Sequence, residues 1–266
     1  MSYRRLDDLD RSLWRAVVEL YISDPLTHCY LMYDLIYELE NIDAVFRMRN
    51  GVIDAYVLLW RGPHVYGVHL WGSDIDLLKR VELPRDVPTY IHLYTDDRRF
   101  AEKVIEIAKD SRSVVRAMEF LDMVTDEKSF RPYNPEAARR LGEEDLDAFL
   151  EIKRVQGREI DREDARKAIA RGRYYGVYVD GKLAAIAGRY IVLPEVWVIG
   201  DVYVRPEYRG RGYGKIVTSA ITRDAIVSGA TPLLHVDTEN TPAVRLYHRL
   251  GYRVLRKRIW LYIEPH

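Results

Sequence analysis

The chain has 266 residues, of which 48% are apolar, and this is enough for one large hydrophobic core or two ordinary ones. Its 41 Lys and Arg side chains balance 41 Asp and Glu side chains, so the formal net charge is zero. This balance argues against a nucleic-acid or anionic-membrane partner, since such binders normally carry a basic excess. No segment approaches the about 18 apolar residues of a membrane span. Because Met1–Asp8 also lacks the apolar core of a signal peptide, we expect a cytoplasmic protein.

The residue types that most often bind metals or act as nucleophiles are scattered in this chain. The only cysteine, Cys29, lies in an apolar and aromatic stretch, which favours a buried structural thiol. His64, His69 and His92 are isolated, which is typical of core or surface histidines rather than ligands. The sequence therefore predicts no metal site.

The N-terminal part mixes helical and strand patterns. Two helices are expected first, over Leu9–Ile22 and Leu26–Leu39. The dipeptide Asn50-Gly51 predicts a tight hairpin between two of the following strands. A later helix is expected over Arg98–Lys109, and no nucleotide loop or nucleophile motif stands out. The expected strands are Ala44–Arg49, Ile53–Trp60, Val65–Leu70, Tyr90–Tyr94 and Val114–Val124.

A boundary between two domains is expected near residue 130. Pro132 and Pro135 favour extended backbone in the residues before them, which discourages helix at this point. Separate runs of helices and strands lie on either side. We therefore expect one domain over residues 1–130 and a second over residues 131–266.

The C-terminal part alternates helices and strands in a pattern typical of an α/β or α+β fold. Asp180-Gly181 predicts another tight hairpin, and Gly251 is placed to end a helix. The expected helices are Glu143–Lys153, Arg162–Ala170, Lys215–Val227 and Thr241–Leu250. The expected strands are Ala138–Leu141, Tyr174–Val179, Leu183–Val192, Val196–Val204, Leu233–Asp237 and one or two over Arg253–Ile263.

One segment of this part has the composition of an anion site. The strand that ends at Val204 leads into a turn with Gly210, Gly212 and Gly214, and a helix follows directly. Glycines let backbone amides approach an anion closely, and a helix N-terminus adds partial positive charge. Arg209, Arg211 and Lys215 surround the turn with formal charge. The pattern thus indicates a phosphate or pyrophosphate site.

Two other phosphate-binding loops do not fit this segment. A P-loop requires Ser or Thr directly after its lysine, and Ile216 follows Lys215. A dinucleotide fingerprint has the spacing Gly-x-Gly-x-x-Gly, whereas the glycines here alternate from 210 to 214.

The full motif resembles that of a known superfamily. Arg209-x-x-Gly212-x-Gly214, preceded by Val204-x-Pro206-Glu207-Tyr208, resembles the acyl-CoA pyrophosphate motif of the GNAT N-acetyltransferases. A second element, Asn240-x-x-Ala243-x-x-Leu246-Tyr247-x-x-x-Gly251-Tyr252, is similar to the next strand-to-helix segment of that superfamily. The resemblance covers about Pro135 to Ile263. It implies a central, mixed and mostly antiparallel sheet flanked by helices.

The stretch from Ile199 to Gly210 is also similar to a GNAT subgroup with two tandem lobes. There the N-terminal lobe is a diverged copy of the same fold. The resemblance therefore implies a GNAT-like lobe over residues 1–130, ahead of a catalytic domain over residues 131–266.

The resemblance implies acetyl-CoA as co-substrate and assigns its binding residues. The pyrophosphate would lie on the backbone amides of the glycine turn, and the pantetheine arm would pair with the preceding strand as an added strand would. One amide of that strand would polarise the thioester carbonyl. The residues implied are Val202, Tyr203, Val204, Arg209, Gly210, Arg211, Gly212, Tyr213, Gly214, Lys215 and Asn240, with Tyr247 at the sulfur.

The catalytic acid and base differ in how well the sequence specifies them. Tyr247 matches the general acid of the superfamily, since a phenol can donate a proton to the departing thiolate. Many members carry a glutamate base eight residues before the proline that matches Pro206, and here that position is Val198. Asp201 and Glu195 are the carboxylates nearby, and a water chain or no dedicated base is equally open.

We therefore expect an N-acetyltransferase that acts on a primary amine of a small molecule, peptide or protein. An amine of pKa near 8 needs less help from a base than a lysine side chain, so the missing glutamate favours an α-amine. One alternative is a coenzyme A-binding regulatory protein that has lost catalysis. Another is a relative with an aminoacyl-tRNA donor, which the intact acyl-CoA turn disfavours. The oligomeric state stays open between monomer and homodimer.

Overall fold

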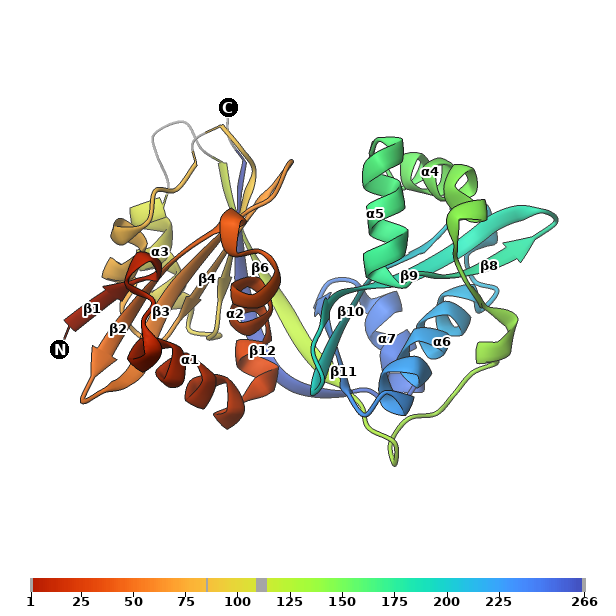
Figure 1. The fold of residues 1–266 in the computed structure, drawn as a ribbon. Coiled ribbons are helices and arrows are strands. Elements are labelled where there is room, and N and C mark those ends of the chain that lie inside the picture. The colour runs from red at the N-terminus through yellow and green to blue at the C-terminus, as the bar shows by residue number, and fades with distance from the viewer. Residues whose placement is uncertain (1, 85, 109–113, 265–266) are drawn as a thin grey trace. The chain divides into compact units, whose positions relative to one another are not determined.

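The computed structural model describes residues 2–84, 86–108 and 114–264, which form two compact units (Figure 1). The first unit contains Met1–Leu121, Asp237–Glu239 and Arg256–His266, and the second contains Asp122–Val236 and Asn240–Leu255. Strands β6 and β12 each contribute residues to both units, so the units do not divide at residue 130. The expected domains, 1–130 and 131–266, stay a prediction.

The first unit is built on a mixed sheet with the order β1-β2-β3-β4-β5-β12-β6. Strands β4 and β5 run parallel, whereas β1–β2, β2–β3, β3–β4 and β5–β12 are antiparallel. Asn50 and Gly51 both have positive φ between β2 and β3, which confirms the predicted hairpin. The strands are β1 (Ser2–Arg5), β2 (Ile42–Arg49), β3 (Val52–Arg61), β4 (Tyr66–Trp71), β5 (Thr89–Leu93), β6 (Val114–Val124) and β12 (Arg253–Glu264).

Helices cover both faces of this sheet. Helix α3 (Arg98–Ala108) buries Ala101 and Val104 in one core together with Val57 of β3. On the other face, His28 of α2 (Pro25–Tyr37) packs against the ring of Tyr56. Cys29 is buried in the same helix, as predicted. Helix α1 and three short 3₁₀ helices complete the unit: α1 (Arg11–Ser23), η1 (Leu6–Asp8), η2 (Leu39–Asn41) and η3 (Ile75–Arg80).

The strands of the second unit follow the order β11-β10-β9-β8-β7. Strands β10 and β11 run parallel and the other pairs are antiparallel, so this sheet too is mixed and mostly antiparallel. Asp180 and Gly181 have positive φ at the β8–β9 hairpin, as the sequence predicted. The strands are β7 (Arg139–Arg140), β8 (Tyr175–Val179), β9 (Lys182–Val192), β10 (Val196–Val204) and β11 (Thr231–Asp237).

Two helical layers enclose this sheet (Figure 1). On one face, α4 (Leu146–Val155) and α5 (Arg162–Gly172) pack against β9, with Phe149 and Ile169 in the same core as Ile186. On the other face, Ala225 of α6 (Tyr213–Val227) packs against Trp197 of β10. The remaining elements are α7 (Thr241–Arg249), η4 (Pro135–Ala137), η5 (Glu143–Asp145) and η6 (Pro206–Tyr208).

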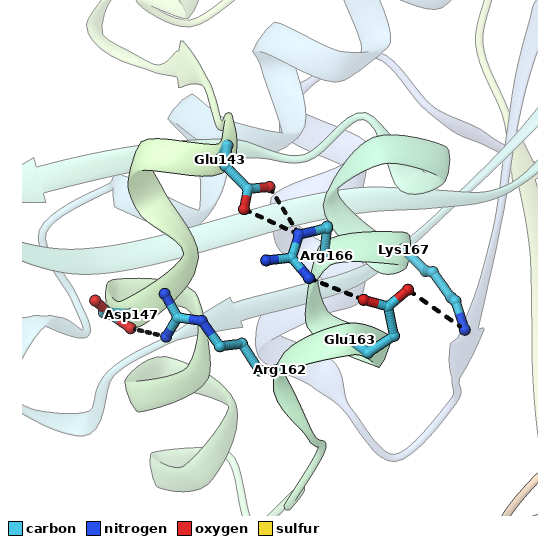
Figure 2. A network of polar contacts seen from close by, with 6 residues as sticks. All are labelled: Glu143, Asp147, Arg162, Glu163, Arg166 and Lys167. Atoms are coloured by element: carbon cyan, nitrogen blue, oxygen red, sulfur yellow. Dashed lines mark hydrogen bonds and ion pairs between the residues drawn. The ribbon is translucent and has the colours of Figure 1, made fainter.

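A network of exposed ion pairs joins α4, η5 and α5 (Figure 2). Arg166 donates through Nε to both oxygens of Glu143, at 2.9 and 3.2 Å, and through a second nitrogen to Glu163 at 2.8 Å. Arg162 pairs with Asp147, and Lys167 with Glu163. Water and salt screen exposed pairs, so the buried contacts of Phe149 and Ile169, rather than this network, hold the two helices to the sheet.

Gly251 occupies a position that only glycine fits. It has φ +88° directly after α7, and a Cβ there would lie 1.9 Å from the backbone oxygen of Ser129. Gly229, after α6, has a similar φ of +83°, but a Cβ there would meet no atom within 4 Å. Comparing the same substitution at the two positions therefore distinguishes the cost of backbone strain from the cost of a steric clash.

We predict that Gly251→Ala lowers the free energy of unfolding by at least about 2 kcal/mol more than Gly229→Ala does. Both variants force a side chain into the left-handed region, at about 1–2 kcal/mol, but only the first also collides with the backbone. Urea denaturation followed by fluorescence measures both. Equal losses in the two variants would show that the segment around Ser129 moves aside without cost.

Candidate active site

The parallel ladder between β10 and β11 stops partway along both strands. It pairs Val196 with Thr231 and ends where Ile199 pairs with Leu234. Strand β10 nevertheless continues to Val204, and there it pairs with β9. The edge of β10 that faces β11 therefore extends beyond the ladder from Gly200 onward, and its backbone groups are available to another extended chain.

A β-bulge lies at the same place in β10. Gly200 pairs with Gly188 and Tyr203 with Ile186, so two residues of β10, Asp201 and Val202, oppose a single residue of β9. Asp201 adopts φ +50°, which is unusual for a residue other than glycine. Strict alternation would place its side chain on the face of Ile199, but the bulge turns it toward Lys153 of α4 and Tyr174.

The glycine turn presents backbone amides at the N-terminus of α6. Gly210 and Gly212 have φ +78° and +89°, and Gly212 is the N-cap of the helix without any side-chain cap. The first bond of the helical ladder is donated by Ile216 to the oxygen of Gly212, at 3.1 Å. The amides of the three preceding residues thus point out of the helix end, where an anion is favoured by hydrogen bonding and by the helix dipole.

The cations around this turn have no carboxylate of their own. Within residues 2–84, 86–108 and 114–264, no ion pair involves Arg209, Arg211 or Lys215. Lys215 instead lies 3.7 Å from the ring centre of Tyr133, and Arg209 donates to the oxygen of Val204. Three cations without a described acidic partner make the turn a positively charged site.

Gly214 has a packing role that differs from that of the first two glycines. A Cβ there would lie 3.1 Å from Leu246 of α7 and 3.3 Å from Val204 of β10. This glycine therefore allows α6 to approach both elements closely. The approach brings the start of α6 beside the edge of β10.

Helix α7 carries the two predicted residues of the second motif. Asn240 is its N-cap, and the side-chain oxygen accepts from the amide of Ala243 at 3.3 Å. Helix capping alone therefore accounts for an asparagine at this position. The cap uses only the side-chain oxygen, so it does not engage the side-chain NH₂ as a donor. Tyr247 is buried, and its ring lies 5.9 Å from the ring of Tyr252.

The pKa of Tyr247 is raised well above its ordinary value, mainly by burial and also by the nearby Tyr190 phenol. The phenol therefore stays protonated throughout the neutral and mildly alkaline range. A raised pKa also makes complete proton transfer less favourable, so the group is suited to donating a strong hydrogen bond to developing negative charge.

Asp201 lies at the centre of a buried polar network. Its carboxylate pairs with the ammonium of Lys153, accepts from Tyr174 at 2.6 Å and from Gln156 at 2.9 Å, and lies 3.5 Å from Arg158. Its side chain is only 1% exposed. With its lone pairs occupied and its charge compensated, this carboxylate is better placed to hold α4 and the following loop than to accept a proton from an amine.

The network perturbs the groups around it. Burial lowers the pKa of Lys153, and the Asp201 charge opposes that effect. Burial first, and then Asp201, raise the pKa of Tyr174 well above its usual value and that of Tyr190 to about 12. Both phenols thus remain donors at neutral pH. The sequence pattern alone did not identify Lys153, Tyr174 or Tyr190, because they come from three distant stretches of the chain: α4, the loop before β8, and β9.

The other predicted base lies elsewhere. Glu195 is exposed in the turn between β9 and β10, at the end of β10 that is paired with β11. Val198, which stands where the superfamily has its glutamate, is fully buried.

Within the described part of the chain, no group of three or more His, Cys, Asp or Glu side chains is arranged to hold a metal ion. None of the described helices is long and apolar enough to span a bilayer.

Comparison with known proteins identifies this architecture. The sequence model of the family described as FR47-like protein matches residues 174–261. A mycothiol acetyltransferase from an Arthrobacter species is 41% identical over 66 residues, which is 24% of this chain and 20% of that protein. The chain thus spans about a fifth of the length of the relatives it matches in sequence.

Two solved structures extend the likeness to both units. A Drosophila protein superposes with a TM-score of 0.74 at 17% identity, covering 99% of this chain and 98% of that one. A tandem GNAT protein from the clavulanic acid biosynthesis pathway superposes with a TM-score of 0.53 at 13% identity, covering 84% and 82%. The chain resembles the GNAT superfamily, as its motifs predicted, and it has the tandem GNAT acetyltransferase fold with an FR47-like segment over residues 174–261.

Proposed function

We propose that this protein transfers an acetyl group from acetyl-CoA to a primary amine, and that the second unit carries out the reaction. The observation that carries the proposal is the positively charged turn at the start of α6, directly beside the free edge of β10. A long thioester that ends in a pyrophosphate fits this combination, because its charge and its amide-bearing arm are matched by adjacent features.

The pyrophosphate would bind the amides of the turn from Arg209 to Lys215, with those two side chains and Arg211 adding charge. The arm would pair with the backbone of residues 202–204 and receive a hydrogen bond from the Asn240 side chain. An amide of the same strand would donate to the thioester oxygen and stabilise the tetrahedral intermediate. Tyr247 would donate to the sulfur as the thiolate departs.

The named relative supports acetyl as the transferred group, since the matching protein is a mycothiol acetyltransferase. For the acceptor, the proposal extends only to a primary amine. The competing function is a regulatory protein that binds coenzyme A without catalysis, and it is supported by the apolar Val198 alone. Because acetyl-CoA is a metabolite of the cell interior, we expect the reaction in the cytoplasm.

We predict that Gly212→Val weakens coenzyme A binding by about a hundredfold or more, because a side chain there would stand between the amides and the pyrophosphate. Isothermal calorimetry gives the affinity and a stoichiometry of one coenzyme per chain. Gly229→Ala, at the far end of α6 and with a similar φ, is the matched control and should bind within about threefold of the parent. Equal affinity in both variants would refute the pyrophosphate site.

We predict that Tyr247→Phe lowers kcat at least about tenfold and changes KM for acetyl-CoA by less than about threefold. The hydrogen bond to sulfur forms only as the thioester breaks, whereas the ring and its packing are retained. Because the Tyr247 pKa is raised, this residue should cause no loss of rate on the alkaline side up to about pH 10. Unchanged turnover in the Phe variant would leave Tyr247 as a packing residue.

We predict that Asp201→Asn destabilises the protein by about 3–5 kcal/mol, because it leaves Lys153 buried without its carboxylate. Adding Lys153→Met should recover part of that loss and restore kcat to within about tenfold of the parent. Urea denaturation and steady-state rates of the two single variants and the double variant test this. A stable double variant that is inactive would instead identify Asp201 as the general base.

A further inference from the structure

A tyrosine ring covers the start of the free edge of β10. Gly200 is the first residue of β10 beyond its ladder with β11, and a Cβ on Gly200 would clash with the ring of Tyr190. The proposed acyl arm would run back along β10 from the glycine turn, so its acyl end would lie toward Gly200. Tyr190 therefore borders the place where the acetyl group would meet the acceptor.

Arg158 lies beside this ring, at the C-terminal end of α4. It follows Gly157, whose φ of +81° ends the helix, and its amide donates to the oxygen of Lys153 at 2.9 Å. Its guanidinium lies 3.5 Å from the carboxylate of Asp201 and interacts with the Tyr190 phenol. The end of α4 thus holds a cation next to the first two residues of β10 beyond the ladder.

The guanidinium of Arg158 is accessible, whereas the ion pair next to it is buried. The side chain of Arg158 is 56% exposed and Tyr190 is 49% exposed. Lys153 and Asp201 are both buried. An open guanidinium and an open ring therefore border the proposed acyl end of the strand, where a ligand can reach them.

The cluster carries one more positive charge than negative charge. Asp201, its carboxylate, already pairs with Lys153 and accepts from Gln156 and Tyr174. Within the described ranges of the chain, no second carboxylate forms an ion pair with Arg158. A guanidinium has five N–H donors in a planar fork that matches a carboxylate, and a contact of 3.5 Å engages it only weakly. One carboxylate supplied by a ligand would balance the charge and fill the fork.

We propose that the acceptor is a free amino acid, whose carboxylate binds Arg158 while its amine attacks the thioester, an inference that rests on the proposed function. The Tyr190 phenol connects the two positions, because it interacts with Arg158 and lies near the Tyr247 phenol that is proposed to face the sulfur. A peptide or protein N-terminus has no carboxylate next to its amine. This binding mode therefore selects a small molecule.

The net positive charge of the cluster also favours the reactive form of the acceptor. A nearby positive charge disfavours the ammonium and favours the neutral amine, which is the form that attacks a thioester. The amine nitrogen bonds to the thioester carbon, and the carbon–sulfur bond breaks. The proton lost by nitrogen balances the proton gained by sulfur, so the products are an N-acetyl amino acid and free coenzyme A.

The first test compares each proteinogenic amino acid with its own amide as the acceptor, with acetyl-CoA as the donor and release of free thiol as the signal. At least one amino acid should have a kcat/KM about a hundredfold above that of its amide, which keeps the amine but lacks the charge. If calorimetry shows coenzyme A binding but the amides react equally well, or neither series reacts, this inference fails alone. If coenzyme A does not bind, the proposed function fails with it.

The second test asks whether Arg158 causes that preference. Arg158→Gln should lower kcat/KM for the amino acid about tenfold to a hundredfold through KM, and change kcat/KM for the amide by less than about threefold. Arg162→Gln is the matched control, because Arg162 is similarly exposed, at 58%, and pairs with Asp147 instead. It should match the parent with both acceptors. Equal losses with acid and amide in Arg158→Gln would reduce Arg158 to a structural partner of Asp201.

Charge reversal gives a result that lost stability cannot produce. Arg158→Glu should repel a carboxylate, so the amide should become the better acceptor of the two. Its affinity for coenzyme A by calorimetry should stay within about threefold of the parent, since Arg158 lies outside the pyrophosphate turn. A folded Arg158→Glu variant that still prefers the amino acid would show that the carboxylate binds elsewhere. If this variant does not fold, the Gln variant decides.

Discussion

The bulge in β10 is the local constraint on which the second unit depends. One extra residue in that strand breaks the alternation of side chains and puts Asp201 into a left-handed backbone conformation. Such a conformation is sustained only when surrounding contacts fix it, and Lys153, Tyr174 and Gln156 do so. Asp201 thus both contacts α4 and lies at the bulge, just beyond the point where the parallel ladder of β10 with β11 ends.

The edge of β10 and the turn before α6 lie side by side because α6 approaches the sheet closely at Gly214. Gly214 permits that approach, and Gly210 and Gly212 shape the turn without any steric need at Gly210. The N-terminus of α6 therefore lies beside the part of β10 that continues beyond its ladder with β11. In the proposed reaction, binding and chemistry would lie along a single line of backbone, from the N-terminus of α6 to the bulge.

Much of the fold could be predicted from the sequence, because local signals were strong. Asn50-Gly51 and Asp180-Gly181 specified their hairpins, and the spacing of the glycines from 210 to 214 specified the turn. The strand Ser2–Arg5 was missed because four residues give too short a pattern. The helix expected from Glu143 begins as a 3₁₀ turn, since the buried Asp145 side chain accepts from the backbone of Gly142 there.

The residues of the glycine turn were easier to predict than those of the buried network at Asp201. Contiguous residues build the turn, whereas the network at Asp201 joins α4, β10 and Tyr174, which directly precedes β8. Strict alternation alone does not give the face of Asp201, because no residue type in the stretch marks the extra residue of the bulge. Such juxtapositions come from register, which a single sequence does not encode locally.

Tyr133 has a consequence for how the chain responds to its ligand. Its ring holds the ammonium of Lys215, its hydroxyl lies 3.3 Å from the Cβ position of Gly212, and its amide donates to Ser219. Any anion that binds the turn competes with this ring for the same cation. Occupancy of the turn by an anion and the conformation of the segment around Tyr133 would therefore be linked equilibria: a ligand that draws Lys215 away from the ring would release that segment, and a change that fixes the segment would alter the affinity for the ligand.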